Sequence, residues 1–292
     1  MLSSTTSSPS GSLLPIPTVY DTPTTKKMPA LPGGLDELTL HTALAHTRPI
    51  HLDEMKEVAL LKRVEQKFVL QSRLLPLILA QLRDEYAVLE VAGQKLNRYR
   101  TLYFDTADFA MYHMHHNRAA DRFKVRSRTY VESEISFLEV KHKTNKQQVN
   151  KDRVQTPELL MALEKDAADF VGSTCPYAAG EMVPTLWNSY RRITLVNKVD
   201  KERVTLDIDL NYTWHDTFVS LPGVLIAEVK QERLSRDSRF VQLMRQHRVR
   251  STGFSKYCVG VSLIYPELKH NRFKTKHRLI SSLMQGERHE YH

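Results

Sequence analysis

The sequence predicts an α+β protein in which antiparallel strands dominate and helices lie between hairpins. Segments rich in β-branched and aromatic residues, several with apolar and polar residues in alternation, recur through the middle of the chain. Two pairs of these segments are joined by short polar turns, which is typical of hairpins. Three helical windows lie between them, and the first carries apolar residues at helical spacing.

The expected elements follow the chain in order. Strands are predicted over 63–70, 98–106, 122–131, 134–143, 189–198, 202–212 and 223–232. The segments 122–131 and 134–143 form one predicted hairpin, and 189–198 and 202–212 form the second. Helices are predicted within Leu74–Glu90, Pro157–Phe170 and Ser238–His247, with Thr156 as the N-cap of the second.

Length and charge narrow the possible classes of protein. The chain has 292 residues, 42 Lys and Arg against 33 Asp and Glu, and a formal charge of +9, which indicates an anionic partner without identifying it. The longest apolar run, Leu74–Ala80, is far shorter than the roughly 20 residues of a membrane span. We therefore expect no transmembrane segment. No signal peptide is recognisable either, so we expect a cytoplasmic protein. Cys175 and Cys258 are too few for a disulfide scaffold or a four-thiolate zinc site.

Composition divides the chain into three parts. Residues 1–50 are largely Ser-, Thr- and Pro-rich, and we expect them to form a disordered tail. Residues 269–292 are basic and are expected to form a C-terminal tail. The folded domain is therefore assigned to residues 51–268, which suits a single domain.

The polar face of the predicted strands is charged almost throughout. Lys124, Arg126 and Arg128 share one strand face, and Glu228 and Lys230 share another. Such a face could be the solvated side of an open sheet with cross-strand ion pairs. It could equally line a closed antiparallel barrel, where Lys and Arg would bind a polyphosphate-like anion. Patterning alone leaves both arrangements open.

A set of motifs in one order gives a more specific indication. Between about Lys62 and Gly260 the chain contains RVEQKF, YRTLYFDT, FKVRSRTY, FLEVKHK, KDR, YRR, RVTLDIDL, AEVK and FSKYCVG. This set resembles the vacuolar transporter chaperone (VTC) domain, the polyphosphate polymerase branch of the triphosphate tunnel metalloenzymes. The resemblance implies an α+β fold with an eight-stranded antiparallel β tunnel, the triphosphate tunnel fold, and helices packed outside. It also implies transfer of the ATP γ-phosphate to a polyphosphate chain, with Mn²⁺ or Mg²⁺ as cofactor.

The resemblance also assigns candidate site residues. The expected catalytic cations are Lys67, Arg126, Arg128, Lys141, Arg192, Arg203 and Lys256. The expected metal ligand is Glu228. Further substrate-binding residues are expected at Glu65, Lys124, Glu139, Lys151 and Arg153. Where many superfamily members carry E-x-E-x-K, this chain has Arg63, Glu65 and Lys67, which favours the polymerase branch and one dominant metal.

Other functions remain possible at this stage. The same tunnel could hydrolyse inorganic triphosphate or nucleoside triphosphates, or bind polyphosphate without turnover. A nucleic-acid partner is not expected, because no RNP-like motif or helix-turn-helix is present. ATP and inorganic polyphosphate are therefore the expected partners.

Several further residues could have either a structural or a functional role. Glu139, Asp207 and Asp209 could be ion-pair partners of nearby cations as readily as helpers at the site. The run His113, His115 and His116 could bind zinc, although a surface run is favoured. Asp105 is expected to cap a turn, and Cys258 to be a small buried hydrophobe.

Overall fold

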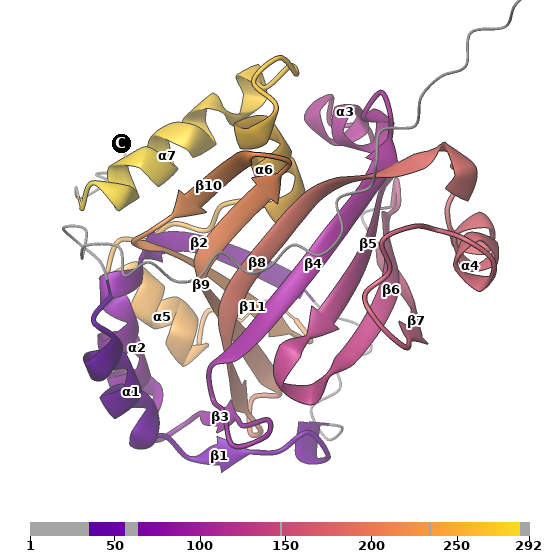
Figure 1. Ribbon diagram of the computed structural model, residues 1–292. Helices are drawn as coiled ribbons and strands as arrows, with labels where there is room; N and C mark the ends of the chain where they lie inside the picture. Colours follow the sequence, from indigo (N-terminus) through magenta and orange to yellow (C-terminus); the bar gives the residue numbers. More distant parts are fainter. Residues whose placement is uncertain (1–34, 56–63, 147, 234, 287–292) are drawn as a thin grey trace, which may run out of the picture. The chain divides into compact units, whose positions relative to one another are not determined.

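The computed structural model describes residues 35–55, 64–146, 148–233 and 235–286. Most of the predicted N-terminal tail, residues 1–34, lies outside the described residues, as do the last residues of the predicted C-terminal tail, 287–292. The described part is an α+β protein with one large antiparallel sheet, as the sequence predicts (Figure 1). None of the helices in these ranges has the length and apolarity needed to cross a membrane.

The strands are β1 (Pro49–Ile50), β2 (Val64–Gln71), β3 (Ala87–Leu89), β4 (Asn97–Thr106), β5 (Arg122–Tyr130), β6 (Ile135–Lys143), β7 (Val149–Thr156), β8 (Met182–Asn197), β9 (Glu202–Trp214), β10 (Thr217–Leu221) and β11 (Val224–Gln231). The α-helices are α1 (Glu37–Ala45), α2 (Leu75–Leu82), α3 (Ala110–His116), α4 (Asp166–Thr174), α5 (Arg239–Gln246), α6 (Lys256–Ile264) and α7 (Lys274–Met284). Short 3₁₀ helices occupy Ser72–Leu74, Val131–Ser133, Ala179–Glu181 and Asn271–Phe273.

Eight of the strands form one antiparallel path in the order β2-β11-β9-β8-β4-β5-β6-β7. Both predicted hairpins are present, as β5–β6 and β8–β9. The short strands β1, β3 and β10 add to this path and bring the sheet to 11 strands, more than the eight expected. The expected closure is also corrected: β2 and β7 form the two ends of the path, so the described strands are not joined into a hydrogen-bonded ring.

The sheet nevertheless curls until its charged face encloses an interior. Lys141 on β6 and Glu65 on β2 lie near opposite ends of the path, yet Lys141 Nζ lies 3.8 Å from Glu65 Oε2. On the same face Glu139 is 1%, Asp207 2% and Arg128 5% exposed. A solvated open face would leave these charges in water, so that reading of the pattern is wrong.

The opposite, outer face of the sheet is apolar and covered by helices. Helices α1, α2 and α5 pack on the outward residues of β2, β11, β9 and β8, in a core that includes Phe68, Leu206, Leu225 and Phe240. A second core, which includes Val125 and Leu138 of β5 and β6, takes α4. The expectation of helices outside the sheet therefore holds for these four helices.

Local sequence explains where several helices begin. Asp36, Ser238 and Ser255 each accept a hydrogen bond from a backbone N–H in the first turn, of α1, α5 and α6 respectively. In the β8–β9 turn, the Asn197 side chain accepts from the backbone N–H groups of Val199 and Asp200. Side-chain capping of this kind stabilises a tight turn at a polar sequence.

The two predicted tails differ from the structure, because each contains a helix. Helix α1 lies inside the range assigned to the N-terminal tail and buries Leu40 and Leu44 in the core. Helix α7 lies inside the range assigned to the C-terminal tail, with Leu279, Ile280 and Leu283 buried. In both, a few well-spaced apolar residues outweigh a polar composition.

The predicted helix at Pro157–Phe170 is also wrong over most of its length. Thr156 ends β7 and its hydroxyl donates to Glu158 O instead of capping a helix. The backbone N–H of Leu160 donates to the Ser127 hydroxyl on β5. The segment is thus bound to the sheet, and α4 begins only at Asp166. The window Leu74–Glu90 likewise splits into α2 and β3.

Candidate functional site: a cation-rich interior

The inner face of the curled sheet gathers more cations than carboxylates. Among the described residues, strand alternation, register and contacts place at least eleven cations on this face or at its edge, including Lys67, Lys124, Arg126, Arg128, Lys141, Lys151, Arg153, Arg192, Arg203, Lys230 and Lys256. They place four carboxylates there: Glu65, Glu139, Asp207 and Glu228. Every site residue predicted from the sequence belongs to these two groups.

Glu139 is the centre of one cluster, on β5, β6 and β7. Arg126 donates to Glu139 Oε2 through Nε at 2.6 Å, and Lys151 pairs with Oε1. Arg128 lies 3.9 Å away through Nη1. Although burial raises the pKa of a carboxyl group, the charges of Arg126 and Arg128 hold the pKa of Glu139 well below its usual range. Glu139 is therefore ionised and fixes three cations.

Asp207 on β9 is the centre of the second cluster. Arg192 Nε and Nη2 donate to its two oxygens at 2.5 and 2.8 Å, and the ammonium of Lys256 donates to Oδ2. Burial opposes ionisation, but Arg192 and Lys256 lower the pKa of Asp207 to about 2. Because Lys256 begins α6, this carboxylate joins a strand to a helix.

Two stacked tyrosines support the cations of the second cluster. The Tyr99 and Tyr190 rings lie 5.1 Å apart and nearly parallel. The Arg192 guanidinium lies 4.9 Å from the first ring centroid, and Lys256 Nζ lies 4.5 Å from the second. Such cation–π contacts hold a cation in place without neutralising its charge, which leaves it available to an anion.

Glu228 on β11 is the centre of the third cluster. Lys67 Nζ lies 3.1 Å from Glu228 Oε2, and Lys230 pairs with Oε1. Burial lowers the pKa of Lys67, but the charge of Glu228 reverses this and the net pKa is raised. The pKa of Glu228 lies well below its usual range because Lys230 and Lys67 outweigh the effect of burial.

Burial lowers the pKa of three other lysines of the interior. Burial, with Lys141 and Lys67 nearby, lowers the pKa of Lys124 to about 8. Burial also lowers the pKa of Lys151 to about 7 against the pull of Glu139, with Arg126 adding to the shift. The pKa of Lys256 is lowered to about 8 by burial although Asp207 opposes it. Cations held in this way are stabilised by an incoming anion.

Solvent reaches this interior. The side chains of Lys67, Lys141 and Lys151 retain 25, 36 and 28% exposure. These cations are thus accessible from outside, whereas the carboxylates Glu139 and Asp207 are fully buried beneath them. The arrangement suits a polyanion, because guanidinium and ammonium groups bind phosphate oxygens strongly.

Two members of the site were missed or undervalued in the sequence. Lys230 shares the alternating face of Glu228, and this alternation was a sufficient signal to include it. Asp207 was left open between two roles, and the structure shows it as an ion-pair partner.

Two predicted residues lie further from the three clusters. Arg203 shares the Asp207 face and stands opposite Lys230 in register, while the Arg153 guanidinium lies over the Phe137 ring.

The carboxylates of the interior fit a metal ion that is bound jointly by the protein and by substrate phosphates. They fit a metal ion bound by protein side chains alone less well. Among the described residues, no group of three or more His, Cys, Asp and Glu side chains could hold a metal ion. Glu228 and Glu65 both lie close to Lys67 and Lys230. Mg²⁺ is commonly held by one or two carboxylates together with substrate phosphates, and these two carboxylates fit that pattern.

The histidine run is not a metal site in the described structure. His116 is buried, and its Nε2 lies 2.8 Å from Asn271 Oδ1, so the favoured surface reading is wrong for this residue. Asp105 accepts from the backbone N–H groups of Met111 and Tyr112, which confirms it as a cap. Cys258 is buried and free, as expected for a small hydrophobe, and Cys175 is also buried and free.

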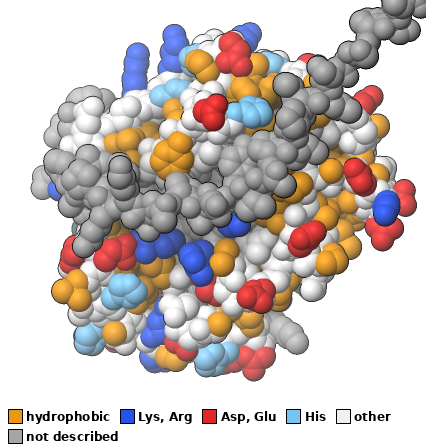
Figure 2. All heavy atoms as spheres, viewed as in Figure 1, with side chains coloured by type: hydrophobic (Ala, Val, Ile, Leu, Met, Phe, Trp, Pro, Cys, Tyr) orange, Lys and Arg blue, Asp and Glu red, His pale blue; other side chains and the backbone are white. Residues whose placement is uncertain are grey.

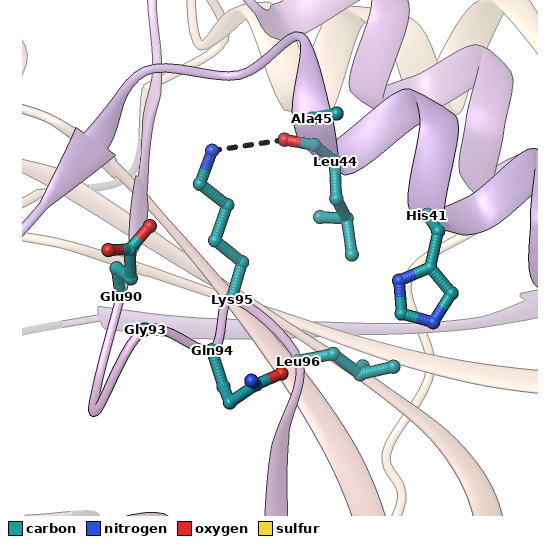
Figure 3. A pocket seen from close by; sticks show the side chains of 8 residues that line it. All are labelled: His41, Leu44, Ala45, Glu90, Gly93, Gln94, Lys95 and Leu96. Atoms are coloured by element: carbon teal, nitrogen blue, oxygen red, sulfur yellow. Dashed lines mark hydrogen bonds between the residues drawn. The ribbon is translucent and has the colours of Figure 1, made fainter.

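A separate hollow lies between α1 and the turn after β3. It has a volume of about 270 Å³ and is lined by His41, Leu44, Ala45, Glu90, Gly93, Gln94, Lys95 and Leu96 (Figure 3). Its one lysine, Lys95, donates to Leu44 O and Thr47 O and so caps the end of α1. On the described outer surface visible in Figure 2, acidic and basic side chains are interspersed. The interior is therefore the stronger candidate site.

Comparison with known proteins supplies a family. A family model described as the VTC domain matches residues 62–265. This range contains the strands β2 and β4–β11 and the helix α6, which together supply every residue of the interior site. A search of curated proteins found no match.

Solved structures give weaker likenesses. A putative adenylate cyclase from Vibrio parahaemolyticus matches with a TM-score of 0.43 and 13% identity, over 68% of this chain and 97% of that one. A putative adenylyl cyclase from Hippeastrum, described as having dominant triphosphatase activity, gives 0.41 and 18% over 68% and 95%. The Pct1 RNA triphosphatase of S. pombe gives 0.27 and 9% over 86% and 94%.

Proposed function

Because this chain belongs to the VTC domain family, we propose that its interior transfers the γ-phosphate of ATP to the end of a polyphosphate chain. One observation carries the proposal: an enclosed face on which cations outnumber carboxylates, with lysine pKa values lowered by burial. Such a face is costly to maintain without an anion. A chain of phosphates is the anion that would contact cations on many strands at once.

The roles of the residues follow from their positions. Arg126 and Arg128, held by Glu139, and Lys67, held by Glu228, would bind the nucleotide phosphates. Lys141, Arg192, Arg203 and Lys256 would bind the acceptor chain, and Glu65, Lys124, Lys151 and Arg153 would add charge around them. Glu139 acts by positioning its arginines.

Glu228 is the proposed ligand of Mn²⁺ or Mg²⁺, with Glu65 beside it. When bound, the ion would neutralise charge on the phosphate oxygens and orient them. The lysines next to these carboxylates compete for the same oxygens, so a phosphate-borne metal would exchange one set of ion pairs for another.

The chemistry itself needs little from the protein. A terminal phosphate oxygen of the acceptor attacks the γ-phosphorus, the bond to the β-phosphate oxygen breaks, and ADP leaves while a new P–O–P linkage forms. The attacking oxygen is already anionic, so no general base is required. The interior cations would stabilise the charge that spreads over the transferring group, which is the main catalytic term in such reactions.

The test is to incubate the purified protein with ATP and Mn²⁺ and resolve ADP, free phosphate and acid-stable polyphosphate over time. We expect ADP to appear together with a lengthening polymer. ADP with an equal amount of free phosphate would instead show a hydrolase, and no turnover would contradict an enzyme.

Variants make this test specific. Arg126→Ala removes one charge-assisted phosphate contact, worth about 1.5–3 kcal/mol, and should lower kcat/KM by about 10- to 100-fold. Glu228→Gln should abolish transfer but leave binding of metal-free tripolyphosphate at least as tight, since it removes an interior negative charge. Arg191→Ala is the matched control, because Arg191 pairs with Glu37 and Asp209 away from the interior. Equal activity in all three variants would contradict the proposal.

A further inference from the structure

The alternation of side chains along β9 reverses between its two halves. In the first half, odd-numbered residues face the interior, as Asp207 does at the centre of its cation cluster, while Ile208 packs in the outer core. In the second half, even-numbered residues face the interior, since Leu210 and Tyr212 belong to the core around α6. A regular strand, with its period of two, could not place both sets inward.

An inserted residue in β9 causes this reversal. Ser189 of β8 pairs with Asn211, but Arg191 pairs with Ile208. One residue of β8 therefore stands opposite the two residues Asp209–Leu210, which is the arrangement of a β-bulge. At the same place β9 changes its neighbour on the other side, from β11 to β10.

The bulge depends on an uncommon backbone conformation. Asp209 has a φ of 53°, in the left-handed region. Glycine adopts this region freely, Asp and Asn adopt it more readily than other residues, and a β-branched residue is strained there. The Asp209 carboxylate itself is 46% exposed and pairs with Arg191 outside the interior. The feature that Asp209 contributes to the site is therefore its backbone.

Two asparagine side chains bind the backbone of the bulge. Asn211 Nδ2 donates to Asp209 O, and Asn188 Nδ2 donates to Asn211 O, each at 3.0 Å. Asn188 is only 1% exposed, so this donor is committed to the protein backbone. Hydrogen bonds of this kind compensate for the ladder bonds that a bulge interrupts.

Each half of β9 supports a different part of the interior. The first half presents Asp207, which binds Arg192 and Lys256. The second half packs on α6, where a Cβ atom at Gly260 would lie only 2.5 Å from Tyr212 Cδ1. Helix α6 therefore lies on the inner face, unlike the outer helices that were expected. Because Lys256 is the first residue of α6, the bulge places both this lysine and the carboxylate that it binds.

We propose that Asp209 is a positioning residue, whose left-handed backbone forms the bulge that orients Arg192 and Lys256 for phosphoryl transfer. The inference relies on the proposed function for the reaction that these cations serve. Loss of the left-handed conformation changes how the two cations are aimed, but it removes no cation from the interior. The expected signature is therefore a lower kcat with a nearly unchanged affinity for a phosphate chain.

The experiment compares two substitutions that both remove the Asp209 carboxylate. Valine is strained at a positive φ, whereas glycine is not. We expect Asp209→Val to lower kcat for transfer at least tenfold, while the Kd of metal-free tripolyphosphate changes less than threefold. Asp209→Gly should restore kcat to within threefold of the native value. Ser189→Val is the matched control: it adds a β-branched residue opposite Asn211 on β8, where φ is not positive, and should change neither quantity.

Other outcomes separate this inference from the proposed function. Equal kcat values in Asp209→Val and Asp209→Gly would overturn the positioning role, and so would a loss of affinity as large as the loss of kcat. If Asp209→Val does not fold, Asn188→Ala removes a hydrogen bond to the bulge and should give the same split between kcat and Kd. Loss of neither would then overturn the inference. No transfer by the native protein would contradict the proposed function and this inference with it.

Discussion

Two residues that alternate on one strand can have opposite surroundings where the strand is irregular, and Asp207 and Asp209 are an example. Asp207 pairs with Arg192 and Lys256 in the interior, whereas the Asp209 side chain is 46% exposed and pairs with Arg191. Removing one partner of a buried ion pair leaves an uncompensated charge, while an exposed pair contributes little.

We therefore expect Asp207→Asn to lower the free energy of unfolding by about 3 kcal/mol. Asp209→Asn is the matched control and should cost less than about 1 kcal/mol. Asparagine also tolerates the left-handed backbone at this position, where φ is 53°. Urea denaturation of both variants measures the difference. Equal losses in the free energy of unfolding would show that the buried ion pair of Asp207 contributes no more than the exposed pair of Asp209.

The lowered pKa values of Lys124 and Lys151 predict a pH dependence. In the unfolded chain the pKa values of these lysines are near the ordinary 10.5, whereas in the folded protein they are about 8 for Lys124 and about 7 for Lys151. Between pH 7 and 9 the unfolded chain therefore holds more protons, and the free energy of unfolding of the ligand-free protein should rise with pH. Denaturation curves across this range test the sign.

Anion binding should have the opposite dependence on pH. Because a polyphosphate is bound by charged lysines, its affinity should fall as pH rises from 7 to 9, and binding at pH 8 should take up protons. Titration calorimetry with tripolyphosphate in two buffers of different ionisation enthalpy measures this uptake. Lys124→Arg keeps the positive charge but does not titrate in this pH range, so it should reduce the proton uptake. An unchanged uptake would mean that Lys124 does not gain a proton when the anion binds.

At this scale the sequence predicted which charged residues share the inner face, but not how they pair. Alternation on strands indicated that Lys124, Arg126 and Arg128 share a face, and the motif order assigned Arg126 and Arg128 to a tunnel. Which carboxylate holds which cation depends on strand register and on curling. These are non-local, so the Lys141–Glu65 contact and the role of Asp207 could not be read from the chain.

Among the elements, α6 is the helix whose position most affects the interior, since its first residue, Lys256, binds Asp207 there. Its sequence, KYCVGVSLI, is apolar enough to be a core helix but does not state on which side of the sheet it packs. Gly260 is the residue that allows its close approach to Tyr212 and Leu186.

Gly260→Ala should destabilise the protein by about 1–3 kcal/mol, because overpacking outweighs the better helix propensity of alanine. Gly253→Ala is the control in the segment just before the helix, since a Cβ atom there meets nothing within 4 Å. Thermal unfolding of the two variants makes the comparison. Greater stability in Gly260→Ala would show that α6 is not closely packed against the sheet.

Strands were predicted better than helices at the scale of elements. All seven predicted strands are present, because alternation and β-branched residues are local signals. The helix at Pro157–Phe170 failed because binding of Leu160 to Ser127 replaced helical hydrogen bonds. Helices α1 and α7 were missed because each depends on tertiary packing of few apolar residues.

For the described molecule as a whole, the balance of interior charge predicts strong stabilisation by anions. A ligand that binds only the folded state raises the free energy of unfolding by about 2.7 kcal/mol at 100 times its Kd. Metal-free tripolyphosphate should therefore raise the Tm of the native protein and of Arg191→Ala alike, and raise that of Arg126→Ala much less. A Tm that rises equally with sulfate at the same ionic strength would contradict a site for phosphate chains.

The packing of α6 against the inner face of the sheet also bears on local opening of the fold. Tyr257 and Gly260 of this helix lie against Tyr103 of β4, Leu186 of β8 and Tyr212 of β9, so the helix can unfold only when these contacts break. Its backbone amide hydrogens should therefore exchange with solvent as slowly as those of the central strands, and hydrogen-exchange mass spectrometry measures the rates.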